Sequence, residues 1–129
     1  MTKTKGKSGS PEAMTIMAPL ESGGGGGIVR FSGLIPEEAQ MLVEMGAMDP
    51  EECQNSSPSI REFIELGGKY SGMTFFGYRV LPEREDERIS IEGFLVPSKS
   101  VDRASLLQLS QLRADEFDEE NGVIRAWWD

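Results

Sequence analysis

Glu92 is the side chain in this sequence that is best placed for acid–base chemistry. It lies in an apolar, strand-like run two residues before Phe94, and we expect Arg79 of the preceding run to lie diagonally across from it. Burial beside an aromatic ring would raise the pKa of such a carboxyl group, whereas a neighbouring guanidinium would lower it. A structural ion pair explains the same pattern, so we interpret Glu92 as a binding residue and not as a catalyst.

The remaining composition offers little for catalysis. The chain has 129 residues, no histidine and a single cysteine, Cys53, so the common zinc, haem and copper ligand sets and the histidine-activated nucleophiles are missing. The acidic run containing Asp49, Glu51 and Glu52 lacks the alternating oxygen ligands and central glycine of a calcium loop. We therefore expect no catalytic residue, no metal site and no cofactor, and a protein that is not an enzyme.

The strongest structural signal is a pair of strand-like runs, 73–81 and 88–96, rich in β-branched and aromatic residues. They are joined by a charged loop that opens with Pro82, so they predict an antiparallel hairpin. Symmetric pairing about this loop predicts two faces, with Val80 opposite Ile89, Tyr78 opposite Ile91 and Phe76 opposite Gly93 on the inner one, and Phe75 opposite Phe94 and Arg79 opposite Ser90 on the outer one.

Three helices are predicted around this hairpin. Pro36 opens the first, Ser59 opens the second, which Gly67 is expected to stop, and a wide apolar stripe predicts the third over 101–112. With a first strand over 28–32, this order predicts an α+β domain of ferredoxin-like (βαββαβ) type. Its antiparallel sheet would carry helices on one face, with an extra helix and a C-terminal hairpin strand added.

The two ends of the chain differ in character. Residues 1–27 contain lysines, serines and five consecutive glycines, which predict a flexible tail, and we assign 28–129 to a single domain. Near the other end, Asn121-Gly122 predicts a two-residue hairpin turn. Pairing about it sets Glu116 opposite Trp127, so Trp128 points to the core and Trp127 to the opposite face.

Charge and hydropathy exclude several classes of partner. The net charge is −9, from 13 basic and 22 acidic side chains, which removes the main source of affinity for a phosphate backbone and predicts no direct nucleic-acid binding. No apolar stretch has the length of a membrane span or a signal-peptide core, so we expect no membrane association. The single cysteine fits a reducing cytoplasm.

Binding to an unknown protein partner is the function that remains. Phe75, Phe94 and Trp127, rimmed by Arg79 and Glu92, would form an aromatic docking patch on the outer sheet face. Self-association through that face, giving a homodimer, is one form of the same hypothesis.

Two alternatives stay open. The carboxylates of the terminal hairpin would imitate a phosphate backbone and block a DNA-binding protein. A pocket between the helix layer and the sheet would bind a small metabolite. The acidic patch of the first alternative consists of Asp115, Glu116, Asp118, Glu119 and Glu120.

Overall fold

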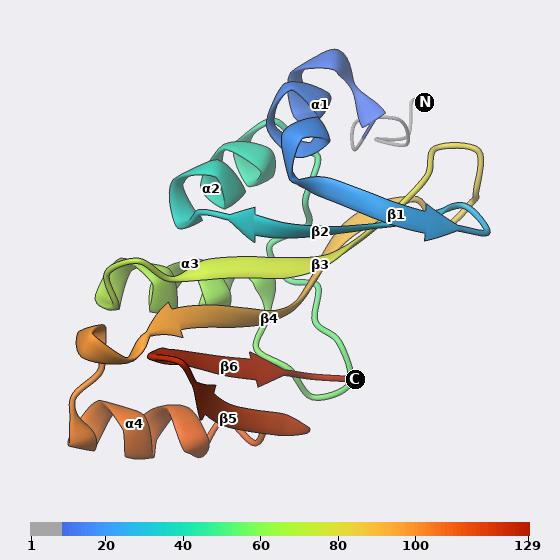
Figure 1. Cartoon of the computed structure of the whole chain (residues 1–129). Helices are drawn as coiled ribbons and strands as arrows, with labels where there is room; N and C mark the ends of the chain where they lie inside the picture. Colours follow the sequence, from blue (N-terminus) through green and yellow to red (C-terminus); the bar gives the residue numbers. More distant parts are fainter. Residues whose placement is uncertain (1–8) are drawn as a thin grey trace.

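A computed structural model describes residues 9–129, which form an α+β fold built on one six-stranded antiparallel sheet (Figure 1). The helices are α1 (Pro11–Met17), α2 (Pro36–Glu44), α3 (Ile60–Lys69) and α4 (Arg103–Ser110), with short 3-10 turns η2 (Ala18–Leu20) and η3 (Ser98–Ser100). The strands are β1 (Glu21–Gly25), β2 (Ile28–Leu34), β3 (Thr74–Val80), β4 (Arg88–Pro97), β5 (Glu116–Glu120) and β6 (Val123–Trp127).

The strand order is β1-β2-β3-β4-β6-β5, and it corrects the predicted ferredoxin-like topology. In the ferredoxin-like arrangement each helix joins two strands that are separated by another strand. Here α2 and α3 lie between β2 and β3 in the chain, yet these two strands are direct neighbours. The chain therefore leaves β2, forms α2 and α3, and re-enters the sheet as the neighbouring strand β3. Strands β1 to β4 form a meander with two helices inserted between β2 and β3.

The N-terminal segment belongs to the domain, which corrects the tail predicted over 1–27. The Ser10 side chain accepts a hydrogen bond from the Ala13 amide and so caps α1, and Ala13 and Met17 are fully buried. The glycine-rich strand β1 pairs with β2 through its backbone, which needs no apolar alternation and so left no signal in the sequence. The remainder of the predicted tail, residues 1–8, lies outside the described residues.

A bulge in β4 determines which side chains face the core. Phe76 pairs with Gly93 as predicted, but Gly77 pairs with Ile91, so Glu92 is an extra residue on its strand. Strand β3 alternates between half-buried and buried positions from Thr74 to Arg79. Ile91 and Phe94, which the sequence assigned to opposite faces, are therefore both buried, whereas Phe76, predicted on the same face as Ile91, is only half-buried.

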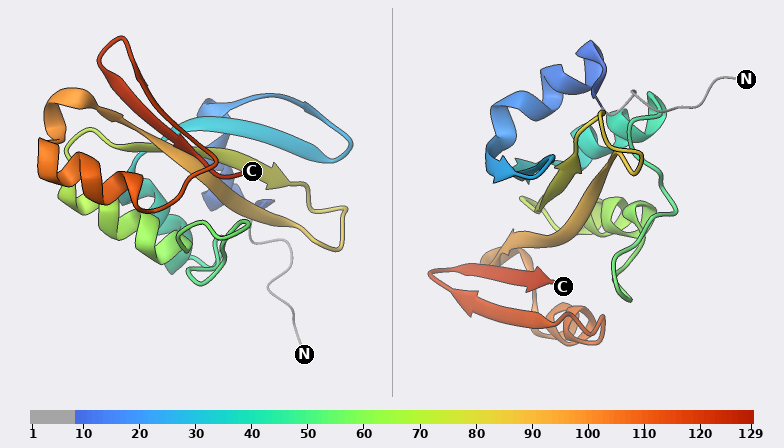
Figure 2. Two further views of the ribbon diagram at one scale, coloured as in Figure 1. Left: turned by 90° about the horizontal axis from the view of Figure 1, so that it is seen from below. Right: turned by 90° about the vertical axis from the view of Figure 1, so that its right-hand side faces the viewer.

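The core lies between the sheet and its helices. Figure 2 shows α2, α3 and α4 gathered on one side of the sheet. Phe63 of α3 is fully buried, and its ring centre lies 5.8 Å from that of Phe75 and 5.6 Å from that of Trp128. The predicted register of the terminal hairpin is confirmed, with Glu116 opposite Trp127.

α2 and α3 begin where Pro36 and Ser59 predict, whereas α4 begins at Arg103, capped by Asp102, and is shorter than the predicted 101–112. α3 does not end at its glycines. Gly67 lies inside α3, and a side chain there would meet the ring of Pro36 at the start of α2, with 2.8 Å between the added Cβ and the Pro36 Cβ. The glycine thus permits close packing of two helices instead of stopping one. Within residues 9–129, no helix combines the length and the apolar character needed to cross a bilayer.

Candidate functional site

Two of the predicted docking aromatics are core residues. Phe75 and Phe94 pair with each other across β3 and β4 and are 0% exposed. Their placement on the outer face was wrong because the bulge at Glu92 was not visible in the alternation of the sequence. They support the surface from beneath and cannot contact a partner.

Arg79 is also buried, and it lies opposite Ile89 and not Ser90. Its guanidinium forms a two-pronged ion pair with Glu21 of β1, with Nε 2.5 Å from Oε2 and Nη2 3.2 Å from Oε1. The two side chains are only 7% and 13% exposed. This pair ties the edge strand β1 to the middle of the sheet, so we assign Arg79 a structural role.

Glu92 contacts Arg30 and Trp128, and not Arg79, the partner that the sequence predicted. Its Oε1 accepts a hydrogen bond of 2.8 Å from Nη1 of Arg30, and its backbone carbonyl accepts one of 2.9 Å from the Trp128 amide. Glu92 and Arg79 therefore do not form the ion pair that the sequence predicted. The bulge residue links β2, β4 and the end of β6.

Trp127 is the predicted docking residue that reaches the surface on the open face. It lies opposite Gly93, which lies opposite Phe76, so the two rings flank a glycine across three strands. The guanidinium carbon of Arg125 lies 5.5 Å from the centre of the Phe76 ring and 5.8 Å from that of Trp127. We call Phe76, Arg125 and Trp127 the outer-face patch; all three are half-buried.

Glu116 completes one rim of the outer-face patch. It lies opposite Trp127 on the edge strand β5, and its Oε1 accepts a hydrogen bond of 2.8 Å from Nη1 of Arg125. The carboxylate therefore holds the guanidinium between the two rings. Phe76 and Arg125 were missing from the sequence-based site, although the predicted terminal hairpin already put Arg125, two residues before Trp127, on the same face of its strand.

The predicted acidic patch does not form one continuous surface. Alternation along β5 puts Glu116, Asp118 and Glu120 on the face of Trp127, whereas Glu119 pairs with the buried Ile124 and points to the helix side. Asp115 accepts a hydrogen bond of 2.7 Å from the Asp129 amide. The five carboxylates are thus divided between two faces and the chain terminus.

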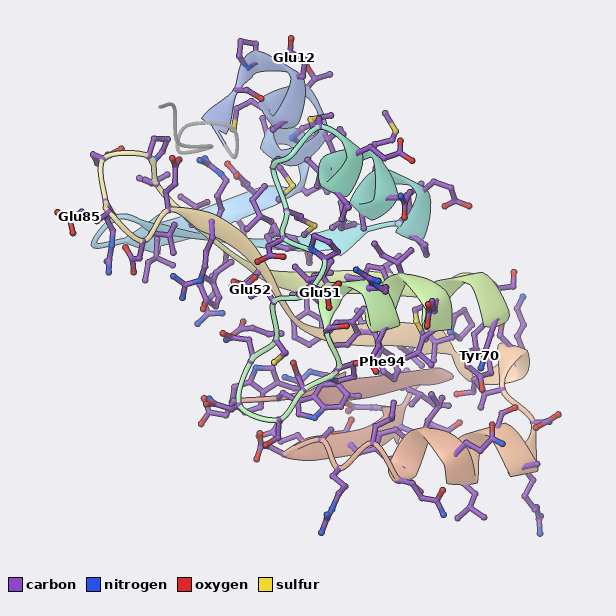
Figure 3. The ribbon with its side chains drawn as sticks, turned by 180° about the vertical axis from the view of Figure 1, so that it is seen from behind. Glu12, Glu51, Glu52, Tyr70, Glu85 and Phe94 are labelled. Atoms are coloured by element: carbon purple, nitrogen blue, oxygen red, sulfur yellow. The ribbon has the colours of Figure 1, made fainter. Side chains whose placement is uncertain are left out.

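A polar cluster that the sequence did not indicate joins the segment between α2 and α3 to strands β3 and β4. Glu52 comes from the segment between α2 and α3, where Figure 3 shows it beside Glu51. It accepts a hydrogen bond of 2.7 Å from the Ser90 hydroxyl and pairs with Arg88, which also donates to the Tyr78 hydroxyl at 2.8 Å. Burial raises the pKa of Glu52, although its bonds to Ser90 and Arg88 oppose the shift.

This cluster is structural in character. The Ser90 side chain is fully buried and its hydroxyl donates to a carboxylate, so no substrate reaches it. The cluster fixes the segment between α2 and α3 to Tyr78 and Ser90, and Figure 2 shows this segment on the same side of the sheet as α2 and α3. Within residues 9–129, no group of three or more histidine, cysteine or carboxylate side chains is arranged to hold a metal ion.

Comparison with known proteins found no matching family model, no matching curated protein and no matching solved structure. Function is therefore argued from the chemistry of the surface alone.

Proposed function

We propose that this domain is a non-enzymatic, cytoplasmic protein-interaction module that binds a partner through the outer-face patch. The observation that carries the proposal is the position of Arg125 between the half-buried rings of Phe76 and Trp127. Tryptophan, tyrosine and arginine are the residues that most often dominate binding energy at interfaces. Holding the guanidinium in place lowers the entropy lost when a partner packs on it.

The arrangement of buried charge supports a scaffold and not a catalyst. Arg79 forms an ion pair with Glu21, and Glu92 forms one with Arg30. Glu52 pairs with Arg88 and accepts a hydrogen bond from Ser90. Each pair joins separate segments of the chain. The charged groups inside the domain thus serve to fix the surface, which is what a docking module requires.

A protein partner is favoured over the two other occupants of this face. A second copy of the chain would bring its own Glu116, Asp118 and Glu120 towards the same three carboxylates, and like charges at an interface are repulsive. Phosphate mimicry needs a continuous run of negative charge, whereas Glu119 and Asp115 are directed elsewhere. The aromatic patch is therefore the better supported binding surface.

The test is affinity capture from an extract of the native cells with three baits. These are the wild type, Trp127→Ala, and Met41→Ala as a matched control, because Met41 is an exposed apolar residue (49%) on α2, away from the patch. We expect one protein to be captured by the wild type and by Met41→Ala and to be lost from Trp127→Ala. Capture that all three baits share equally contradicts the proposal.

Ionic strength separates docking from mimicry in the same experiment. A complex anchored on aromatic rings loses little affinity between low and moderate salt, because the apolar contacts are not screened. A phosphate mimic would release its target steeply over that range, and charge reversal at Asp118 and Glu120 would abolish its capture. Circular dichroism of each bait confirms that the variants stay folded.

A further inference from the structure

A groove lies between α4 and the β5–β6 hairpin, on the helix side of the sheet. It has a volume of about 480 Å³ and a mostly apolar lining with Arg103 and Glu119 at its rim, and Leu107 in its wall is 61% exposed. An exposed leucine of this kind beside a concave apolar surface is typical of a binding site. The apolar side chains that line it are Leu106, Leu107, Phe117 and Ile124.

One wall of this groove is the outermost strand of the sheet. β5 pairs with β6 on one side and is the end of the strand order, so the backbone groups along its other edge have no strand beside them. Four of its five residues are exposed. Figure 2 (left) shows the terminal hairpin standing clear of the helices at this edge.

The side chains of β5 alternate between two kinds of surface. Phe117 and Glu119 line the groove on the helix side, while Glu116, Asp118 and Glu120 alternate with them on the other face, Asp118 also bordering the groove. Of these three carboxylates, Glu116 is paired with Arg125, and neither of the others forms an ion pair with any residue from 9 to 129. Two negative charges two residues apart are thus available beside an open strand edge.

We propose that the free edge of β5 accepts an extended segment of a partner protein in which basic and apolar side chains alternate. A strand added to a sheet edge has the same two-residue period as β5. Its basic side chains would lie beside Asp118 and Glu120, while its apolar side chains on the other face would lie over the groove beside Leu107. Backbone pairing supplies the remaining contacts.

The charge of this edge selects against other strands. A second copy that added its own β5 would oppose carboxylates to carboxylates, and β1, the other edge of the sheet, has glycine at three of its five positions and no apolar side chain for the groove. The site is separate from the outer-face patch, because Trp127 does not line the groove and Leu107 is on α4. Either site can fail without the other.

Binding of labelled, blocked peptides to the full chain, followed by fluorescence anisotropy, tests the proposal. The probe is a short peptide of alternating lysine and leucine. One control has the same composition with all lysines before all leucines, and the second is the alternating peptide with N-methyl groups that prevent backbone pairing. We expect each control to bind at least about tenfold more weakly than the alternating peptide.

Variants of the chain locate the site. Leu107→Ser should weaken binding of the alternating peptide about tenfold, because an exposed leucine loses its apolar contact with the peptide. Asp118→Lys combined with Glu120→Lys should abolish binding, whereas Trp127→Ala and Met41→Ala should leave it unchanged. All five positions are at least partly exposed, and circular dichroism verifies that the variants fold.

Three results would overturn the proposal. Equal affinity for the alternating peptide and for the peptide with all lysines before all leucines would show that only charge attraction between peptide and protein drives binding. Full binding by the N-methylated peptide would show a groove that takes side chains or small molecules without strand addition. Unchanged affinity in Leu107→Ser would place the peptide elsewhere on the molecule.

Discussion

The guanidinium of Arg125 lies over the ring of Phe76, with 5.5 Å between the guanidinium carbon and the ring centre. This contact is partly exposed, so replacing Arg125 with alanine should lower the free energy of unfolding by only about 0.5–1 kcal/mol. Arg125→Lys should retain the charge but lose the flat stacking surface, and so weaken partner capture nearly as much as alanine does. Urea unfolding checks the first expectation, and a loss above about 2 kcal/mol would mean that Arg125 is chiefly structural.

Gly93 allows the outer-face patch to form. A methyl group there would lie 2.6 Å from the Phe76 ring and would also clash with the Ala126 carbonyl. We expect Gly93→Ala to destabilise the fold by about 1–3 kcal/mol through overpacking. Gly68→Ala is the matched control, because the added Cβ meets nothing within 4 Å and alanine favours the helix. Urea unfolding should show a loss in the first variant and a small gain in the second; equal effects would contradict the packing argument.

The ion pair between Arg79 and Glu21 should be among the most sensitive contacts in the domain. Both side chains are nearly buried, so removing one partner leaves an uncompensated charge, and Glu21→Gln should cost about 3–5 kcal/mol of unfolding free energy. The double variant Glu21→Gln, Arg79→Met should lose less than the sum of the single variants. A double-mutant cycle measured by urea unfolding tests this, and strict additivity would show that the pair is not coupled.

Glu52 should make stability depend on pH in an unusual direction. Its pKa is raised by burial above the ordinary value of 4.5, so the folded state takes up a proton before the unfolded state as the pH falls. The burial penalty present at neutral pH is therefore relieved as the pH falls through the folded pKa, and nothing more is gained below the unfolded pKa. Relative to Glu52→Gln, the unfolding free energy of the wild type should rise from pH 7 towards pH 4.5. An unfolding free energy of the wild type that stays constant or falls relative to that of Glu52→Gln over this pH range would contradict the assignment.

Local signals in the sequence predicted much of the fold. The Asn121-Gly122 turn determined the register of the terminal hairpin and, with it, the opposite directions of Trp127 and Trp128. Pro36 and Ser59 predicted the starts of α2 and α3. Each of these features depends on residues close together in the chain, which is why a single sequence can report them.

The errors in the predicted site have nonlocal causes. The bulge at Glu92 is defined by the pairing of β4 with β3, which the alternation within one run does not show. The alternation therefore placed Phe94 on the wrong face. The partner of Arg79 is Glu21, in a glycine-rich strand whose pairing depends on the backbone alone. Trp127 was identified because its position followed from a tight turn, and the outer-face patch around it emerged only with the order of β3, β4 and β6.

Photo-crosslinking at position 127 in living cells tests the docking surface most directly. Trp127 is replaced with a photoreactive benzoylphenylalanine, and Met41 is replaced in the same way as a control on α2. We predict a discrete crosslinked product with one partner protein from position 127 and none from position 41. The same products from both positions, or no product from position 127, would contradict a docking role for the outer-face patch.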